Sequence, residues 1–119
     1  MPDAPLRIAS NDLTVEVATL GAELQRVTDA QGRDLLWDGA PAFWTGRAPI
    51  LFPIVGALAG GGYMLDGRRY ELPKHGFARR MPFEPISVAD DEVLLRLGAS
   101  AETLAVYPFA FRLDLRFRV

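Results

Sequence analysis

The only histidine of the chain, His75, stands in the stretch LPKHGFARR, which spans residues 72–80. Lys74, Arg79 and Arg80 lie within five residues of it. An imidazole exchanges a proton near neutral pH, so it suits general acid or base chemistry, but a lone histidine among cations is also typical of a solvated surface. Both interpretations are open from this stretch alone.

The composition excludes several kinds of site. The chain has one histidine and no cysteine, so it holds neither a multi-histidine nor a thiolate metal site of its own. The glycine-rich stretch GALAGGGY lacks both the Lys-Ser/Thr ending and the GxGxxG spacing of the familiar phosphate loops, and we interpret it as a flexible loop. We therefore expect no metal and no cofactor.

Charge and hydropathy exclude further classes of binding partner. The formal net charge is −2, which gives no general attraction to nucleic acid or to anionic membranes. The longest apolar run, APILFPIVGALAG at 48–60, is too short and too interrupted by proline to span a bilayer, and is expected to be buried in protein. The first residues have no basic or apolar signal region, so we expect a cytoplasmic protein with neither nucleic acid nor membrane as a partner.

Most of the chain has the period of β-strands. Apolar and polar residues alternate in LTVEVATL and continue in ELQRV, and a turn at Gln31-Gly32 precedes a further expected strand, DLLW. Asp66-Gly67 and the segment 89–91 predict two more hairpins. One short helix is expected in SAETLAVY, between an N-cap at Ser100 and a stop at Pro108. At 119 residues the chain has room for one all-β, antiparallel domain.

The final stretch, FAFRLDLRFRV, keeps its strand alternation up to the last residue. Such a pattern predicts that the chain is the front part of something longer; the alternative is a C-terminal strand in the centre of a sheet. An open strand edge and an uncovered apolar face would also favour self-association of the fragment.

Five segments, taken in order, resemble one protein family. The series LGAEL, DLLW, FWTGRAPILFPIVG, YMLDGRRYELPKHGFAR and YPFAFRL is similar to the N-terminal half of the aldose 1-epimerase, or galactose mutarotase-like, family, and to its bacterial branch with APxLFP followed by KHGFAR. The resemblance implies an antiparallel β-sandwich, part of a larger supersandwich, with a sugar cleft on one broad face. It also implies that residues 1–119 are the N-terminal part of one truncated domain.

The resemblance also implies site residues. His75 matches the family's first active-site histidine, and Arg47 matches its arginine that donates to sugar hydroxyls. Phe77 would support the loop from beneath in the substrate site. From its charge alone, Arg79 would approach a negatively charged substituent, as in a sugar phosphate; the alternative is that Arg79 and Arg80 form a solvated pair. The family's second histidine and its glutamate base fall beyond the last residue, so the chain alone is expected to be inactive; Glu71 and Glu84 are interpreted as solvated strand residues.

Three functions follow from this reading. The first is the interconversion of the α and β anomers of a free hexose, in which a base removes the proton of the C1 hydroxyl and an acid protonates the ring oxygen. The second is the same chemistry on a hexose 6-phosphate, and the third is a non-catalytic carbohydrate-binding β-sandwich. The enzyme readings predict that His75 lies in a cleft near Arg47, whereas Trp37 is expected in the core.

Overall fold

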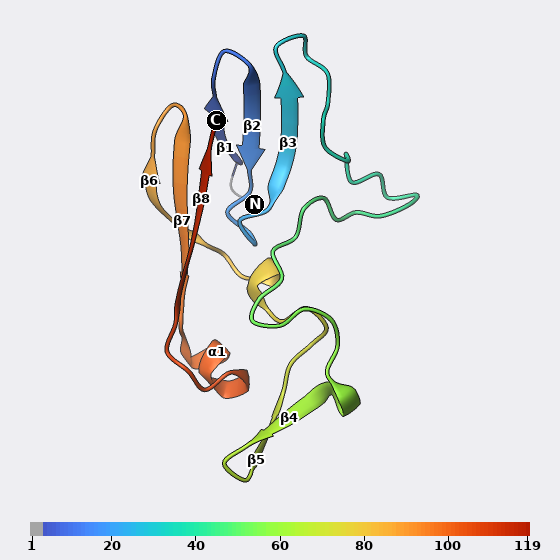
Figure 1. The fold of residues 1–119 in the computed structure, drawn as a ribbon, viewed down its shortest axis with the longest axis vertical. Coiled ribbons are helices and arrows are strands. Elements are labelled where there is room, and N and C mark those ends of the chain that lie inside the picture. The colour runs from blue at the N-terminus through green and yellow to red at the C-terminus, as the bar shows by residue number, and fades with distance from the viewer. Residues whose placement is uncertain (1–3) are drawn as a thin grey trace.

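The computed structural model describes residues 4–119, which form antiparallel strands, one α-helix and two short 3-10 turns (Figure 1). The all-β, antiparallel prediction is confirmed. The elements are β1 (Leu6–Ala9), β2 (Leu13–Val17), β3 (Leu24–Asp29), η1 (Ala59–Gly61), β4 (Gly62–Leu65), β5 (Arg68–Glu71), η2 (Ala78–Arg80), β6 (Glu84–Val88), β7 (Glu92–Gly98), α1 (Ala101–Val106) and β8 (Arg112–Arg118).

Strands β1, β2 and β3 form the first sheet, in the order of the sequence. Val15 of β2 stands opposite Ile8 on one side and Val27 on the other, so apolar side chains line one face of the sheet. The predicted alternation in LTVEV accounts for this register, because a shift by one residue would turn the apolar set toward solvent. Strand β1 was not assigned from the sequence.

Strands β6, β7 and β8 form the second sheet, also in sequence order. The predicted turn at residues 89–91 joins β6 to β7 and is closed by a hydrogen bond from the Ala89 N–H to the Glu92 carbonyl oxygen, 2.8 Å. In β8 the half-buried Leu113, Leu115 and Phe117 alternate with exposed charged residues, as predicted.

The two sheets enclose the core between them, so the predicted sandwich is confirmed. Val17 of the first sheet and Val93 and Leu95 of the second have no exposed surface and belong to one apolar cluster. The sheets also join at one edge, where the Ala9 N–H donates to the Asp90 carbonyl oxygen at 2.9 Å. Burial of a large aliphatic side chain contributes about 1.5–3 kcal/mol, so this cluster is the main source of stability in the sandwich.

The predicted helix and the second predicted hairpin lie at the opposite end of the molecule (Figure 1). Ser100 caps α1 in a reciprocal capping box with Thr103. In the β4–β5 hairpin, Asp66 and Gly67 have φ of 49° and 76°, which is the left-handed backbone that a type I′ turn requires. The Tyr63 hydroxyl donates to the Val106 carbonyl oxygen at 2.7 Å and ties this hairpin to α1.

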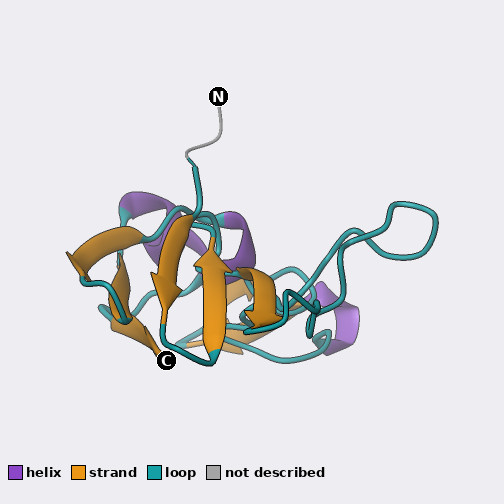
Figure 2. Cartoon of the chain, turned by 90° about the horizontal axis from the view of Figure 1, so that it is seen from above, coloured by secondary structure: helices purple, strands orange, loops and turns teal. Residues whose placement is uncertain are grey.

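The segment after β3 departs from the sequence-based prediction. The turn at Gln31-Gly32 is present, but DLLW forms no strand. Its first residue, Asp34, makes an isolated bridge with Thr28, and the residues after it have no strand pairing. Trp37 is 41% exposed and lies outside the core. Within the described residues no second strand lies beyond β3 to pair with this segment, so its apolar side chains stay on a loop that stands out from the sandwich (Figures 1 and 2). The stretch GALAGGGY, interpreted as a loop, contains η1 and the start of β4.

Candidate functional site

His75 has a constrained local geometry. Its backbone is left-handed, with φ of 66°, and its side chain is half-buried. Two hydrogen bonds join it to Gly56: the His75 N–H donates to the Gly56 carbonyl oxygen at 2.9 Å, and the Gly56 N–H donates to His75 Nδ1 at 2.8 Å. Because Nδ1 is an acceptor here, the neutral imidazole carries its proton on Nε2, which remains available as a donor.

The next residues fix this loop against the apolar segment LFP. Phe52 accepts hydrogen bonds at its carbonyl oxygen from the N–H groups of Phe77 (2.9 Å) and Ala78 (3.2 Å). Gly76 lies so close to the same carbonyl that a side chain there would overlap it, and its φ is 71°. The close approach that requires a glycine is therefore made to the chain's own backbone.

Phe77 lies beneath the histidine loop, in an aromatic cluster. It is 9% exposed, and its ring centroid is 6.0 Å from that of Phe52 and 5.9 Å from that of Phe111. This position suits the predicted support of the loop. Phe77 also lines a cavity of about 240 Å³ between η2 and α1, together with Pro73, Arg80, Met81, Glu102, Thr103 and Val106.

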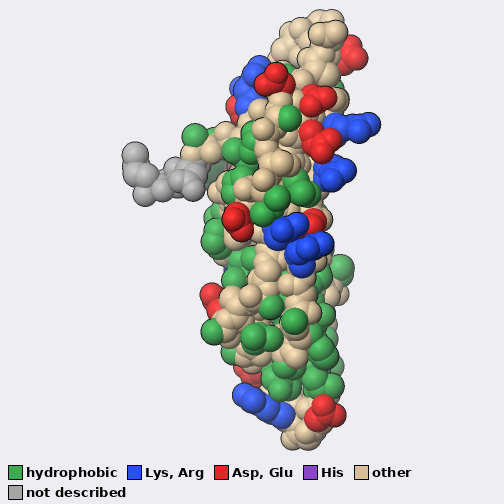
Figure 3. Space-filling view, turned by 90° about the vertical axis from the view of Figure 1, so that its left-hand side faces the viewer, with side chains coloured by type: hydrophobic (Ala, Val, Ile, Leu, Met, Phe, Trp, Pro, Cys, Tyr) green, Lys and Arg blue, Asp and Glu red, His purple; other side chains and the backbone are tan. Residues whose placement is uncertain are grey.

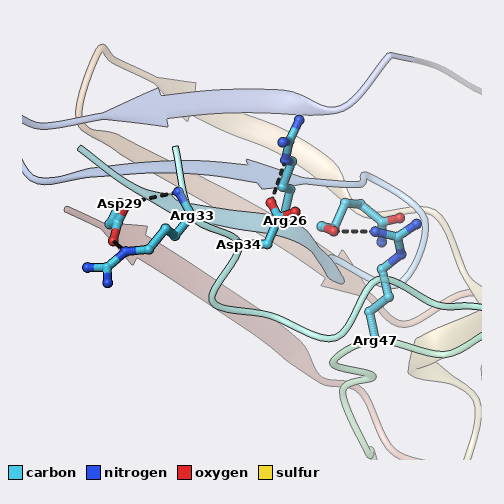
Figure 4. Close-up of polar contacts among 6 residues, drawn as sticks. Arg26, Asp29, Arg33, Asp34 and Arg47 are labelled. Atoms are coloured by element: carbon cyan, nitrogen blue, oxygen red, sulfur yellow. Dashed lines mark hydrogen bonds and ion pairs between the residues drawn. The ribbon is translucent and has the colours of Figure 1, made fainter. Parts of the chain in front are cut away.

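Arg47 is held against β3. Its guanidinium donates from Nη1 to the Gln25 carbonyl oxygen at 2.5 Å, and Figure 4 shows the side chain reaching toward that strand. Arg47 lines a half-open groove of about 680 Å³. The other lining residues are Pro5, Glu16, Ala18, Thr19, Leu20, Glu23, Gln25, Arg26 and Pro82.

Charged pairs surround the far end of β3 in the same view (Figure 4). The Arg33 backbone N–H, with the guanidinium of Arg33 and the N–H of Gln31, holds the pKa of the Asp29 carboxyl below its ordinary value of 3.8. Arg26 and Asp34 form an ion pair at 3.0 Å in which both side chains are more than half exposed. Exposed pairs of this kind contribute little to stability. They hold residues 29–34, where the loop after β3 begins, but they do not determine the path of the residues that follow.

Arg79 has an incompletely satisfied guanidinium. Its Nη2 donates to the Lys74 carbonyl oxygen at 3.3 Å, while its buried Nε has no hydrogen-bond partner among the described residues. A buried donor without a partner is costly, so this group has capacity for an acceptor.

The structure brings the predicted residues together only in part. His75, Phe77 and Arg79 share one loop, and that loop is joined to the segment that follows Arg47 through Phe52 and Gly56. Arg47 lines the groove beside β3, and His75 lines neither this groove nor the cavity beside α1. A common cleft for His75 and Arg47 therefore remains a prediction. Residues 4–119 contain no cluster of three metal-ligating side chains and no helix long and apolar enough to cross a membrane.

Comparison with protein families and known sequences gives a consistent result. The family model described as aldose 1-epimerase matches residues 6–119. Protein LacX, in its plasmid form from Lactococcus lactis subsp. lactis, is 34% identical over 115 residues, which cover 91% of this chain and 38% of that protein. The chromosomal form of LacX is also 34% identical, and the chain again spans 38% of its length.

Solved structures share the fold closely. A galactose mutarotase related enzyme from Lactobacillus acidophilus superimposes with a TM-score of 0.94 at 34% identity, over 97% of this chain and 39% of that one. A galactose mutarotase-like protein from Lactobacillus casei gives 0.92 at 32% identity, over 96% and 39%. A putative aldose 1-epimerase from Escherichia coli K12, at 18% identity and a TM-score of 0.72 over 97% and 41%, supports the fold alone.

Proposed function

The chain belongs to the aldose 1-epimerase family, and from this premise we propose that it binds a hexose and contributes to the interconversion of its α and β anomers. The observation that carries the proposal is the hydrogen bond from the Gly56 N–H to His75 Nδ1 at 2.8 Å. It leaves Nε2–H as the free donor of a half-buried neutral imidazole, which is the form in which a histidine donates a hydrogen bond to a sugar oxygen.

The proposed chemistry needs two proton carriers. One group removes the proton of the C1 hydroxyl while another protonates the ring oxygen, the ring opens, and the roles reverse when the ring closes on the other face. His75 is proposed to donate a hydrogen bond from Nε2–H to a sugar oxygen and so to stabilise the charge that develops there. Arg47 is proposed to donate to sugar hydroxyls, because a planar guanidinium with one Nη bonded to Gln25 keeps further N–H groups for adjacent oxygens.

The proposal predicts the effect of removing the imidazole. In the protein at the full length that its gene encodes, His75→Asn is expected to slow anomer interconversion by about a hundredfold to ten-thousandfold, measured by polarimetry or NMR exchange. Glu84→Gln, an exposed change on β6, serves as the control. An unchanged rate in a folded His75→Asn protein would remove this residue from the reaction.

We propose that residues 1–119 are part of a single sandwich domain that is larger than the chain. The chain covers 39% of the related Lactobacillus acidophilus structure, and its radius of gyration is 16.4 Å, whereas a compact domain of this length has about 14 Å. By family resemblance the second histidine and the glutamate base belong to the remaining part. The 119-residue chain alone is then expected to leave the rate of mutarotation at its value in buffer, and acceleration by the purified chain would refute that assignment.

Uncovered surface supports a second element of the proposal, self-association of the 119-residue chain. In the described residues β8 pairs only with β7, so its outer edge is open, and Ile86, Val88, Leu104 and Phe109 are 38–55% exposed. Figure 3 shows hydrophobic side chains at the surface on the side of the molecule that carries β6 and β7. Open strand edges and apolar patches favour pairing with a second copy, and sedimentation at micromolar concentration tests this. A stable monomer would contradict it.

One observation favours a hexose 6-phosphate as an alternative substrate. The buried Nε of Arg79 has no partner in the described residues, and Lys74 and Arg80 stand in the same loop. A phosphate beside this loop would be attracted by the charges of all three side chains. Titration of the chain with glucose and with glucose 6-phosphate separates the two candidates: tighter binding of the phosphate that is lost in Arg79→Gln supports the alternative, and equal affinities oppose it.

A further inference from the structure

The stretch LGAEL has no part in the proposed chemistry, yet its turn lies against both candidate loops. The turn connects β2 to β3 through two left-handed residues, Gly21 (φ 70°) and Ala22 (φ 47°). The Gly21 N–H donates to the Met81 carbonyl oxygen at 2.8 Å, and a Cβ at Gly21 would stand 2.7 Å from the Arg79 carbonyl oxygen. One side of the turn therefore packs on the loop that carries His75.

Glu23 extends from this turn to the other loop. Its Oε2 accepts hydrogen bonds from the backbone N–H groups of Arg47, at 2.8 Å, and Ala48, at 3.0 Å. The base of the side chain is itself fixed, because the Glu23 carbonyl oxygen accepts from the Ala18 N–H at 2.9 Å where β2 and β3 meet. A half-buried carboxylate thus joins the sheet to residues 24 and 25 positions further along the chain.

These two bonds fall on a segment that has few other constraints. Residues 35–58 contain no helix or strand, so the sheet ladders do not fix the backbone of Arg47. Hydrogen bonds to an ionised group are roughly twice as strong as neutral ones. The guanidinium at the far end of the Arg47 side chain donates to the Gln25 carbonyl oxygen. Gly39 lies against this side chain, since a Cβ at Gly39 would be 3.0 Å from Arg47 Nε.

We propose that Glu23 is a positioning residue of the sugar site: its carboxylate fixes the Arg47 backbone so that the guanidinium faces the groove beside β3. The inference rests on the proposed sugar-binding role of Arg47. The proposal gives the LGAEL turn a function that the sequence did not suggest. On one side the turn holds the backbone of Arg47, and on the other side it contacts the loop of His75.

The test compares three variants of the 119-residue chain, Glu23→Ala, Glu23→Gln and the exposed control Glu84→Ala. The first measurement is amide hydrogen exchange at Arg47 and Ala48. Glu23→Ala is expected to speed exchange at both amides by about tenfold or more, the equivalent of losing hydrogen bonds to a charged acceptor. Glu23→Gln keeps a carbonyl acceptor and should restore part of the protection, whereas Glu84→Ala should leave it unchanged.

The second measurement is the affinity for D-glucose and D-galactose by NMR titration of the protein at the full length that its gene encodes, with Arg47→Ala for reference. Glu23→Ala is expected to weaken binding severalfold, toward the value of Arg47→Ala, and Glu23→Gln less. Persistent amide protection in Glu23→Ala overturns the inference, and so does lost protection with unchanged affinity when Arg47→Ala binds more weakly. If Arg47→Ala itself binds as the parent does, the proposed role of Arg47 fails and the positioning role with it, although the exchange data still establish or refute the contact.

Discussion

In the sandwich, Val17, Val93 and Leu95 have no exposed surface, whereas in the segment between β3 and β6 the side chains of Phe43 and Val55 are 83% and 76% exposed. The sandwich is stabilised mainly by the burial of apolar side chains, which does not depend on the direction of any single contact. The long segment has buried residues of its own, Leu72, Phe77, Ala78 and Phe83, but its loops also depend on directed contacts, such as those of Glu23 with Arg47 and of Gly56 with His75.

This difference has a physical consequence for the site. Burial energy grows with apolar area and tolerates substitutions that conserve volume, but a directed contact depends on one donor, one acceptor and the backbone between them. Among the candidate site residues, Arg47 and His75 depend on directed contacts of this kind, whereas Phe77 is buried. Changes in the core should therefore unfold the chain, while changes in the segment should displace loops and leave the sandwich in place.

The largest effect is expected for Leu95→Ala in the sandwich. The side chain has no exposed surface, and removing a buried leucine leaves a cavity as well as losing transfer free energy, which together cost about 2–5 kcal/mol. Urea unfolding followed by circular dichroism measures the loss. A cost below about 1 kcal/mol would show that the two sheets are not packed as one core.

A smaller but more local effect is expected for Gly76→Ala. The new methyl group would overlap the Phe52 carbonyl oxygen in a left-handed backbone, which costs on the order of 1–3 kcal/mol. Gly32→Ala is the matched control, because Gly32 is also left-handed (φ 81°) but has nothing within 4 Å of the added atom. NMR shift changes should concentrate in the histidine loop for Gly76→Ala; equal destabilisation by both variants would argue against the interlock with Phe52.

A pH dependence is expected at the second sheet. The Arg96 guanidinium bonds to Asp114 at 2.7 Å and, with further attraction from Arg96, Arg112 and Arg116, lowers the pKa of the Asp114 carboxyl below its ordinary value of 3.8. A lowered folded-state pKa stabilises the fold above the unfolded value, and this stabilisation is lost as the pH falls below 3.8 through the folded value. Asp114→Asn should flatten that part of the profile. An unchanged acid profile would contradict the pairing.

The smallest effect is expected for Phe43→Ala. With 83% of the side chain exposed, the substitution should change the free energy of unfolding by no more than about 0.5 kcal/mol, even though a large aromatic ring is removed. The same urea experiment as for Leu95→Ala measures it. A loss above 1 kcal/mol would mean that the ring is buried against a second copy or within the loop, and would weaken the contrast between the two regions.

The same contrast explains which parts of the structure were predictable. Period-2 alternation predicted β2, β3 and β8, and local turn or cap chemistry predicted the hairpins at Asp66-Gly67 and at residues 89–91 and the start of α1 at Ser100. Each of these signals lies within a few residues. The DLLW segment had the composition of a strand, but a strand also needs a partner, and pairing is decided elsewhere in the chain.

The candidate site residues remain a prediction, and the sequence anticipated only part of their local geometry. The motifs placed His75, Phe77 and Arg79 close together in the chain, and the structure shows that Phe77 is buried. They did not reveal that His75 accepts from Gly56 or that Glu23 holds Arg47, because these contacts join residues 19 and 24 positions apart. A carboxylate in an otherwise apolar turn, LGAEL, was the available signal for Glu23.

The hydrogen bond between Ala9 and Asp90 joins β1 to the β6–β7 turn, roughly 80 residues further along the chain. During synthesis at about 5–20 residues per second, the first sheet would be complete on the order of several seconds before β7 emerges to cover it. Its inner face, with Ile8, Val15 and Val17, would remain wet for that time. Within each three-stranded sheet, neighbouring strands are joined by short connections, whereas the packing of one sheet on the other requires a segment that is distant in the sequence. We therefore expect the packing of the two sheets to be the slow, aggregation-sensitive step of folding.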